Sequence, residues 1–314
     1  MTPEPSPRVS VIIPAYNHAR FLSEALESVR AQTFQAFEAL VVDDGSTDET
    51  REVVAAYAPR VGYHYQAHAG VSRARNEGLR RTGAPYVAFL DADDTWAPTK
   101  LARQVAFLDT HPEVGVVFTS YHVTNEAGRP CGVEPGRFPY GERPFETMLL
   151  WPYGSMNVAM VRRSCIARVG GFDEVLTEGE DWDLWLRVSR YYGIANLDEP
   201  LATYRRVASD ATRARRLTTA PAMFRRVLDK LFTDPARLEG CSAAWIRRWR
   251  RRAYASLEIT VALMEQDPPW RCLSAALRLS PFVVCRRWRA MGFLILSGLK
   301  RLAPEPRAVQ GKRQ

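Results

Sequence analysis

Two short clusters of aspartates are the side chains in this sequence best suited to chemistry. Asp43–Asp44 and Asp91–Asp94 each follow a run of apolar residues. Carboxylates that crowd together repel one another, and a cation offsets that repulsion. At the carboxyl end of a buried strand, where open α/β sheets bind ligands, such clusters indicate a hard divalent metal ion and a phosphate-bearing substrate.

The second cluster has the spacing of a metal site. Asp91 and Asp93 lie two positions apart, so in an extended segment they share one face and can address one ligand together. Mn²⁺ and Mg²⁺ use few protein carboxylates and complete their shells with water and substrate phosphates. We therefore predict a Mn²⁺ or Mg²⁺ site in which Asp93 is a ligand, with Asp94 as the alternative candidate. An acidic loop in which Asp94 or Thr95 only caps a turn is the open alternative.

Three single residues are candidates for binding a nucleotide. Asp44 can accept hydrogen bonds from a base or a ribose, or can simply form a turn and a helix cap. Tyr16 can stack on a nucleobase or pack in the core. Arg75 follows Gly70 in the first turns of an expected helix, a setting that suits phosphate, although most arginines are solvated surface charges.

A third acidic group, Glu178–Asp183, stands at the start of another expected helix. Four carboxylates there suit the positive end of a helix dipole. A sharper hypothesis is that Asp181 faces the same crevice and acts as a general base, poised by burial and by its neighbours.

The elements that must position these residues alternate between strands and helices. Apolar runs predict strands over residues 9–13, 37–42, 61–66, 86–90, 114–120 and 155–161. Helical spacing predicts helices over 21–29, 46–57, 71–81, 98–110 and 178–192, the second opened by a Ser46/Glu49 capping box. This alternation predicts an α/β fold with a doubly wound, mostly parallel sheet. Its successive strand ends line one edge, so the acidic clusters should converge there.

The rest of the chain divides by composition. Residues 125–151 are rich in Gly and Pro and are expected to form an irregular loop region. Strand signals stop beyond Arg205, and helices rich in Arg, Trp and Leu follow. We predict a flexible N-terminus at residues 1–8, an α/β domain at 9–205, a basic helical extension at 206–303 and a disordered tail at 304–314.

Charge is unevenly distributed along the chain. Residues 1–204 carry 19 Lys/Arg against 27 Asp/Glu, and residues 205–314 carry 24 against 8. The basic part suits an anionic membrane surface, since Arg247–Arg252 interleaves arginines with a tryptophan. Helices that pack on the α/β domain and expose a solvated Arg face are the open alternative.

Several classes of protein are disfavoured by what the sequence contains. No apolar run approaches the roughly 18 residues of a membrane span. The first residues lack a signal core, and the five cysteines are widely spaced without a C-x-x-C pair. We expect a cytoplasmic protein with reduced thiols that docks peripherally at the inner membrane face.

The order of the motifs resembles the family-2 glycosyltransferases, which are inverting enzymes with a GT-A fold that use nucleotide-diphosphate sugars. The resemblance spans about residues 8–205 and rests on Val9–Asn17, Gln32–Phe34, Val41–Asp48, Ala74–Asn76 and Leu90–Asp94. It implies that the donor is bound by Pro14, Tyr16, Asp44, Arg75, Asp91 and Asp93. Tyr16 and Asp44 would contact the nucleobase and ribose, and Arg75 would lie near the diphosphate.

The resemblance also implies a metal ligand and a base. Asp91-Ala92-Asp93 matches the family's D-x-D motif, which gives Asp93, or Asp94, the metal. Glu180-Asp181 matches the family's E-D pair, whose Asp is the catalytic base. The sequence lacks the Q-x-x-R-W motif of processive synthases, so the implied reaction adds single sugars to a saccharide or lipid-linked acceptor, in cell-envelope polysaccharide or glycolipid synthesis.

Two other functions stay open on the sequence alone. A nucleotide-sugar pyrophosphorylase-like nucleotidyltransferase would need a Gly-rich basic loop after the first strand, where Pro14–His18 stands. A non-enzymatic nucleic-acid-binding protein would use the basic C-terminal part but leaves the acidic groups unexplained. We therefore expect no nucleic-acid partner.

Overall fold

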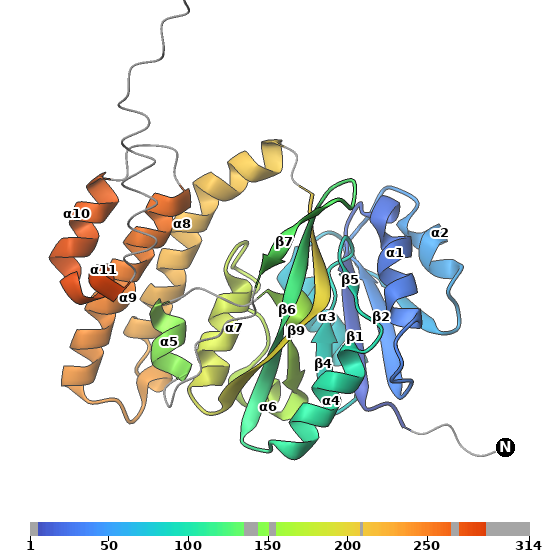
Figure 1. Ribbon diagram of the computed structural model, residues 1–314, viewed down its shortest axis with the longest axis horizontal. Helices are drawn as coiled ribbons and strands as arrows, with labels where there is room; N and C mark the ends of the chain where they lie inside the picture. The colour runs from blue at the N-terminus through green and yellow to red at the C-terminus, as the bar shows by residue number, and fades with distance from the viewer. Residues whose placement is uncertain (1–5, 135–143, 151–154, 208–209, 265–269, 287–314) are drawn as a thin grey trace, which may run out of the picture. The chain divides into compact units, whose positions relative to one another are not determined.

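The computed structural model describes residues 6–134, 144–150, 155–207, 210–264 and 270–286 (Figure 1). The chain folds into two units, residues 1–223 and 224–314. Part of the predicted flexible N-terminus, the predicted tail at 304–314 and the basic extension from residue 287 onward lie outside the described residues. The last strand ends at Arg206, and the predicted domain boundary after residue 205 remains a prediction.

The first unit is built on one mixed sheet. Its strands, in the part of the chain described, are β1 (Val9–Ala15), β2 (Phe37–Asp43), β3 (Val61–Tyr65), β4 (Tyr86–Phe89), β5 (Thr95–Trp96), β6 (Val114–Asn125), β7 (Pro130–Glu134), β8 (Met160–Arg162) and β9 (Gly193–Arg206). They lie in the order β3-β2-β1-β4-β8-β6-β9-β5, and β7 pairs with β6. The first four pair in parallel, whereas β8 runs antiparallel to both β4 and β6. The predicted α/β fold is confirmed.

Helices lie on both sides of these strands (Figure 1). They are α1 (Ala19–Arg30), α2 (Thr50–Ala55), α3 (Val71–Arg81), α4 (Lys100–Thr110), α5 (Pro144–Leu150), α6 (Arg163–Val169) and α7 (Glu180–Ser189), with a 3₁₀ turn at Met156–Val158. All of β1 is buried, which explains its continuous apolar run. The core includes Trp185, whose ring meets that of Phe118 edge to face at 5.4 Å.

Local details differ from the sequence-based expectations in several places. The capping-box prediction is wrong, because Ser46 Oγ accepts from the Asn17 amide at 3.0 Å and α2 begins only at Thr50. The segment 125–151, expected to be irregular, contains β7 and α5. The strand predicted over 155–161 starts as the 3₁₀ turn and becomes a strand only at Met160.

The second unit is helical, as predicted. It contains the end of α8 (Asp210–Thr233), a 3₁₀ turn at Pro235–Leu238, α9 (Ala243–Met264), α10 (Trp270–Leu279) and α11 (Pro281–Arg286). Both α10 and α11 contact α9. Arg225 and Glu258 join α8 to α9 by an ion pair of 2.6 Å. Among the helices described, none combines the length and the apolar character that a bilayer span requires.

Candidate active site

Three parallel strands end together and deliver the predicted site residues to one edge of the sheet. The amide of Asp44 donates to the carbonyl of Ala15 at 2.8 Å, and the amide of Leu90 donates to that of Ile12 at 3.0 Å. The segments that follow β1, β2 and β4 therefore leave the sheet side by side. Pro14 is buried within β1, and its contact with a donor remains a prediction.

Asp44 is buried, and both oxygens of its carboxylate accept hydrogen bonds from the neighbouring loop. Oδ1 accepts from Gln66 Nε2 at 2.6 Å and from the Ala69 amide at 2.9 Å. Oδ2 accepts from the Gly70 amide at 2.8 Å and lies 2.9 Å from His68 Nδ1. Gly70 has φ of 95° and precedes α3, a conformation that favours glycine. Asp44 thus fixes residues 66–70 and the start of α3.

An exposed aromatic pair stands beside this loop. The rings of Tyr16 and His68 stack with centroids 4.1 Å apart at an angle of 24°. Tyr16 is 43% exposed, so it does not pack in the core. The pair offers a flat face on which a base can stack. Sequence reasoning missed His68, because a single histidine after a weak strand carries no spacing pattern.

Arg75 on α3 joins the acidic cluster after β4 to the start of α7. Its two terminal nitrogens donate to Asp91 Oδ1 at 2.9 Å and to Glu180 Oε1 at 2.8 Å. The side chain is buried, which opposes its charge, but the two carboxylates raise the pKa of Arg75 above its ordinary value. Since both terminal nitrogens are engaged by protein, the geometry gives Arg75 a positioning role. Its predicted place near a diphosphate remains a prediction.

Asp181 follows Glu180 in the first turn of α7, after Gly179, whose φ is 77°. Burial, together with the negative charge of Glu180, raises the pKa of Asp181 to about 7, while Arg75 acts in the opposite direction. Asp181 Oδ1 also accepts from the Trp182 amide at 2.7 Å. A carboxyl group with this pKa is close to half ionised at neutral pH, which suits a general base.

Asp94 is the most buried member of the acidic cluster. Its Oδ1 accepts from the Arg205 amide at 2.8 Å, whereas its buried Oδ2 has no hydrogen-bond partner. Burial and then the charges of Asp91 and Asp93 raise the pKa of Asp94 well above its usual value. A buried carboxylate oxygen without a partner is rare in folded proteins and calls for a cation or a proton.

The acidic cluster fits a small divalent cation. Among the described residues, no three His, Cys, Asp or Glu side chains gather as a ready metal cage. Mn²⁺ and Mg²⁺ do not need one, since one or two carboxylates suffice when water and phosphate supply the remaining oxygens. Asp91 is engaged by Arg75, so Asp93 and Asp94 are the residues that would hold the ion.

Arg205 at the end of β9 holds this cluster in place. Beyond the amide bond to Asp94, its Nε donates to the carbonyl of Asp93 at 3.1 Å. Its other guanidinium nitrogens reach the carbonyl of Glu126 at 3.1 Å and the carboxylate of Glu24. Sequence reasoning missed this role, because nothing in the local sequence links Arg205 to residues more than a hundred positions earlier.

Comparisons with known proteins show which family and which folds this chain is similar to. Residues 10–170, just over half of the chain, match the family described as "Glycosyl transferase family 2". The TuaG protein of Bacillus subtilis, whose name describes a teichuronic acid biosynthesis glycosyltransferase, is 37% identical over 128 residues, which cover 40% of this chain and 50% of TuaG. The chain spans between 33% and 61% of the length of the first curated relatives it matches.

Two solved structures share the fold. S. aureus TarS in complex with UDP-GlcNAc matches with a TM-score of 0.62 at 20% identity, over 94% of this chain and 92% of that one. The mannosyltransferase PcManGT from Pyrobaculum calidifontis, in complex with GDP-Man and Mn²⁺, matches with a TM-score of 0.57 at 24% identity, over 97% and 89%. They confirm the predicted GT-A-like fold. By its matched sequence and by its fold, the chain belongs to glycosyl transferase family 2.

Proposed function

We propose that this protein is an inverting glycosyltransferase that moves a single sugar from a nucleotide-diphosphate sugar to an acceptor hydroxyl. The observation that carries the proposal is the placement of Asp181. Its carboxyl group, with a pKa of about 7, is joined through Glu180 and Arg75 to the acidic cluster at the end of β4. A base and a phosphate-binding edge at one site are what such a displacement needs.

The proposed chemistry is one in-line displacement. Ionised Asp181 takes the proton of the acceptor hydroxyl while that oxygen bonds to the anomeric carbon. The bond from this carbon to the diphosphate oxygen breaks, and its electron pair leaves with the nucleoside diphosphate. Attack from the face opposite the leaving group inverts the configuration. Arg75 keeps Glu180 and Asp91 in place on either side, so the position of the base is set before the acceptor arrives.

Donor binding is assigned to the loops after β1, β2, β3 and β4. The stacked rings of Tyr16 and His68 would receive the nucleobase, and Asp44 holds the loop that presents His68. A divalent cation held by Asp93 and Asp94, when bound, supplies positive charge to the departing diphosphate. Two structures with a similar fold support this assignment. TarS is in complex with UDP-GlcNAc, and PcManGT is in complex with GDP-Man and Mn²⁺.

The acceptor is proposed to be a saccharide or a lipid-linked sugar of the cell envelope. The name of the teichuronic acid relative favours a cell-envelope polysaccharide. The basic C-terminal helices favour an acceptor presented at an anionic membrane surface, where the enzyme would dock peripherally from the cytoplasmic side.

Replacing the base tests the proposal directly. In Asp181→Asn, transfer should fall by about 10²–10⁴-fold, the usual contribution of a general base. Donor binding, read as a thermal shift with a panel of nucleotide sugars in the presence and absence of Mn²⁺, should persist. Asp198→Asn removes an exposed carboxylate of β9 and should leave both readouts unchanged. Unchanged turnover in Asp181→Asn would remove Asp181 from this role.

A further inference from the structure

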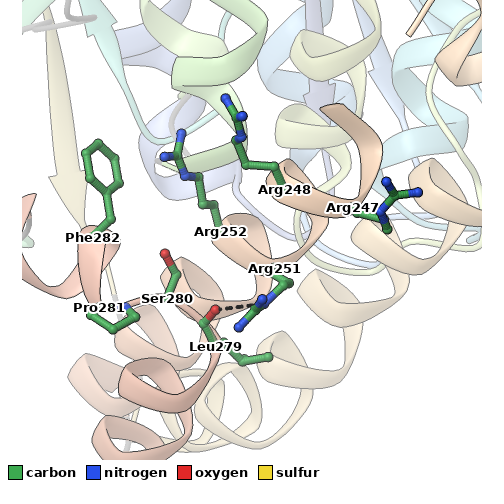
Figure 2. Close-up of a pocket in the computed structure, with 8 residues that line it drawn as sticks. All are labelled: Arg247, Arg248, Arg251, Arg252, Leu279, Ser280, Pro281 and Phe282. Carbon is green, nitrogen blue, oxygen red and sulfur yellow. Dashed lines mark hydrogen bonds between the residues drawn. The ribbon is translucent and has the colours of Figure 1, made fainter. Parts of the chain in front are cut away.

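A pocket in the C-terminal unit is lined by four arginines that the transfer chemistry does not use. It has a volume of about 450 Å³, within the range of small-ligand sites. One wall is the face of α9 that carries Arg247, Arg248, Arg251 and Arg252. The other is Leu279–Phe282, where the chain passes from α10 to α11 (Figure 2).

Helix geometry brings the arginines to one face. Residues four positions apart lie above each other on a helix, so Arg247 pairs with Arg251 and Arg248 with Arg252 on successive turns. Figure 2 shows Arg248 and Arg252 extending in the same direction. Arg251 donates through Nε to the carbonyl of Leu279 at 3.2 Å, which ties α9 to the opposite wall.

The apolar part of the pocket is held by a cation–aromatic contact. The guanidinium of Arg252 lies over the ring of Phe282 at 4.2 Å and near the ring of Trp249 at 5.0 Å. Phe282, which lines the pocket, is still 47% exposed. Positive charge and exposed apolar surface therefore occur together at the pocket.

The described residues that line the pocket include four arginines and no carboxylate. Neither Arg247 nor Arg248 forms an ion pair with another described residue. Elsewhere in the same unit arginines do have acidic partners, as in the pair of Arg225 with Glu258. Four neighbouring guanidinium groups repel one another, and an anion relieves that repulsion. Phosphate matches the planar donors of arginine, which can bind it through two parallel hydrogen bonds.

The exposed ring of Phe282 indicates which kind of molecule carries the phosphate. Free phosphate and a nucleic-acid backbone would gain nothing from the exposed ring of Phe282, whereas a phospholipid offers a phosphate and acyl chains in the same molecule. We propose that this pocket binds the phosphate headgroup of an anionic phospholipid at a membrane surface, with Phe282 entering the boundary of the acyl region. The site is independent of the proposed transfer reaction, and its test needs neither donor nor acceptor.

Vesicle sedimentation with the full chain tests this site. Wild type should bind phosphatidylcholine vesicles that contain phosphatidylglycerol and should not bind pure phosphatidylcholine vesicles. Arg248→Gln should weaken binding about fivefold, the effect expected for one basic residue at an anionic surface. Arg250→Gln is the matched control, since Arg250 is an exposed arginine of the same helix that does not line the pocket. It should bind within about twofold of wild type.

A second variant probes the apolar contact. Phe282→Ser should weaken vesicle binding without changing charge, and circular dichroism melting confirms that each variant is folded. Equal losses in Arg248→Gln and Arg250→Gln would show that only diffuse charge matters and would overturn the proposal. It would also be overturned by no binding to vesicles that contain phosphatidylglycerol, or by duplex DNA that binds more tightly than these vesicles.

Discussion

The backbone amide of Arg205 donates to Asp94 Oδ1 at 2.8 Å, although 111 residues separate the two in the chain. This bond ties the acidic cluster after β4 to the end of β9. It satisfies one oxygen of a buried carboxylate and leaves the other without a partner. The strand therefore fixes the direction in which Asp94 can offer its second oxygen to a ligand.

The acidic cluster should govern metal dependence. Asp94→Asn keeps the shape of the side chain and an oxygen for the Arg205 amide but removes the charge. We expect the Mn²⁺ concentration needed for half-maximal donor binding to rise at least tenfold, about 1.4 kcal/mol. Asp93→Ala should weaken both metal and donor binding. Calorimetric titration of the donor at several Mn²⁺ concentrations measures both effects.

Asp109→Asn is a suitable control for these two variants. Asp109 pairs with Arg8 near the surface and belongs to no part of the proposed site. Donor binding that is insensitive both to EDTA and to the two cluster substitutions would contradict a metal at Asp93 and Asp94.

Activity should depend on pH through the ionisation of Asp181. Only the carboxylate form can accept a proton, and burial and Glu180 raise its pKa to about 7. The value of kcat/KM should therefore fall about tenfold per pH unit below this pKa and level off above it. Glu180→Gln removes a charge that raises the pKa, so the acidic limb should move to lower pH. A profile that is flat from pH 5.5 to about 8, or a limb unmoved by Glu180→Gln, would argue against Asp181 as the base.

The aromatic pair should contribute to nucleotide affinity. Stacking of a base on an aromatic ring is worth about 1–3 kcal/mol, so Tyr16→Ala should weaken binding of the preferred nucleoside diphosphate by about fivefold or more. Tyr16→Phe keeps the ring and should bind almost normally. His68→Ala should also weaken binding, because it removes the partner that orients Tyr16. Calorimetry with UDP and GDP distinguishes these cases, and full affinity in Tyr16→Ala would place the nucleobase elsewhere.

One glycine should matter for stability because of close packing. A Cβ atom at Gly78 of α3 would lie 2.3 Å from Ile12 Cγ2 of β1. Gly78→Ala should therefore lower the free energy of unfolding by about 1–3 kcal/mol, the usual cost of overpacking. Gly83 has no atom within 4 Å of such a Cβ, so Gly83→Ala is the control and should be nearly neutral. Urea unfolding of both variants would show the contrast, and equal stabilities would contradict it.

The sequence predicts the N-terminal half of the sheet well, because burial dominates there. Strand β1 is buried throughout and reads as an unbroken apolar run, and α3 has the predicted bounds of Val71–Arg81. Strand β9 was not predicted, since exposed and polar residues at Asp198–Pro200 interrupt its pattern. The capping box failed because Ser46 bonds elsewhere. Its amide donates to Asp43 Oδ1 at 2.8 Å, and its Oγ accepts from the Asn17 amide at 3.0 Å.

The candidate site, too, could be predicted from the sequence only in part. Carboxylates in short runs can be found in the sequence, since their clustering is local. The hydrogen-bond partners of these carboxylates cannot be found in this way, because they are distant in the sequence. Arg75 and Glu180 are 105 positions apart, and Asp94 and Arg205 are 111 positions apart. The partnerless Oδ2 of Asp94 follows only from the packing of β9 against the loop after β4.

Hydrogen bonds hold the N-terminal part of helix α3 at two points. The amide of Gly70, just before the helix, donates to Asp44. Farther along, Asn76 Oδ1 accepts from the Phe172 amide at 2.8 Å, and Asn76 Nδ2 donates to the Phe172 carbonyl at 3.0 Å. Between these anchors Arg75 reaches the segment that carries the proposed base. Helix α3 therefore connects the loop that would lie beside the nucleobase with the segment that carries the proposed base. Under the proposed function, one helix holds both the donor-binding loop and the proton acceptor.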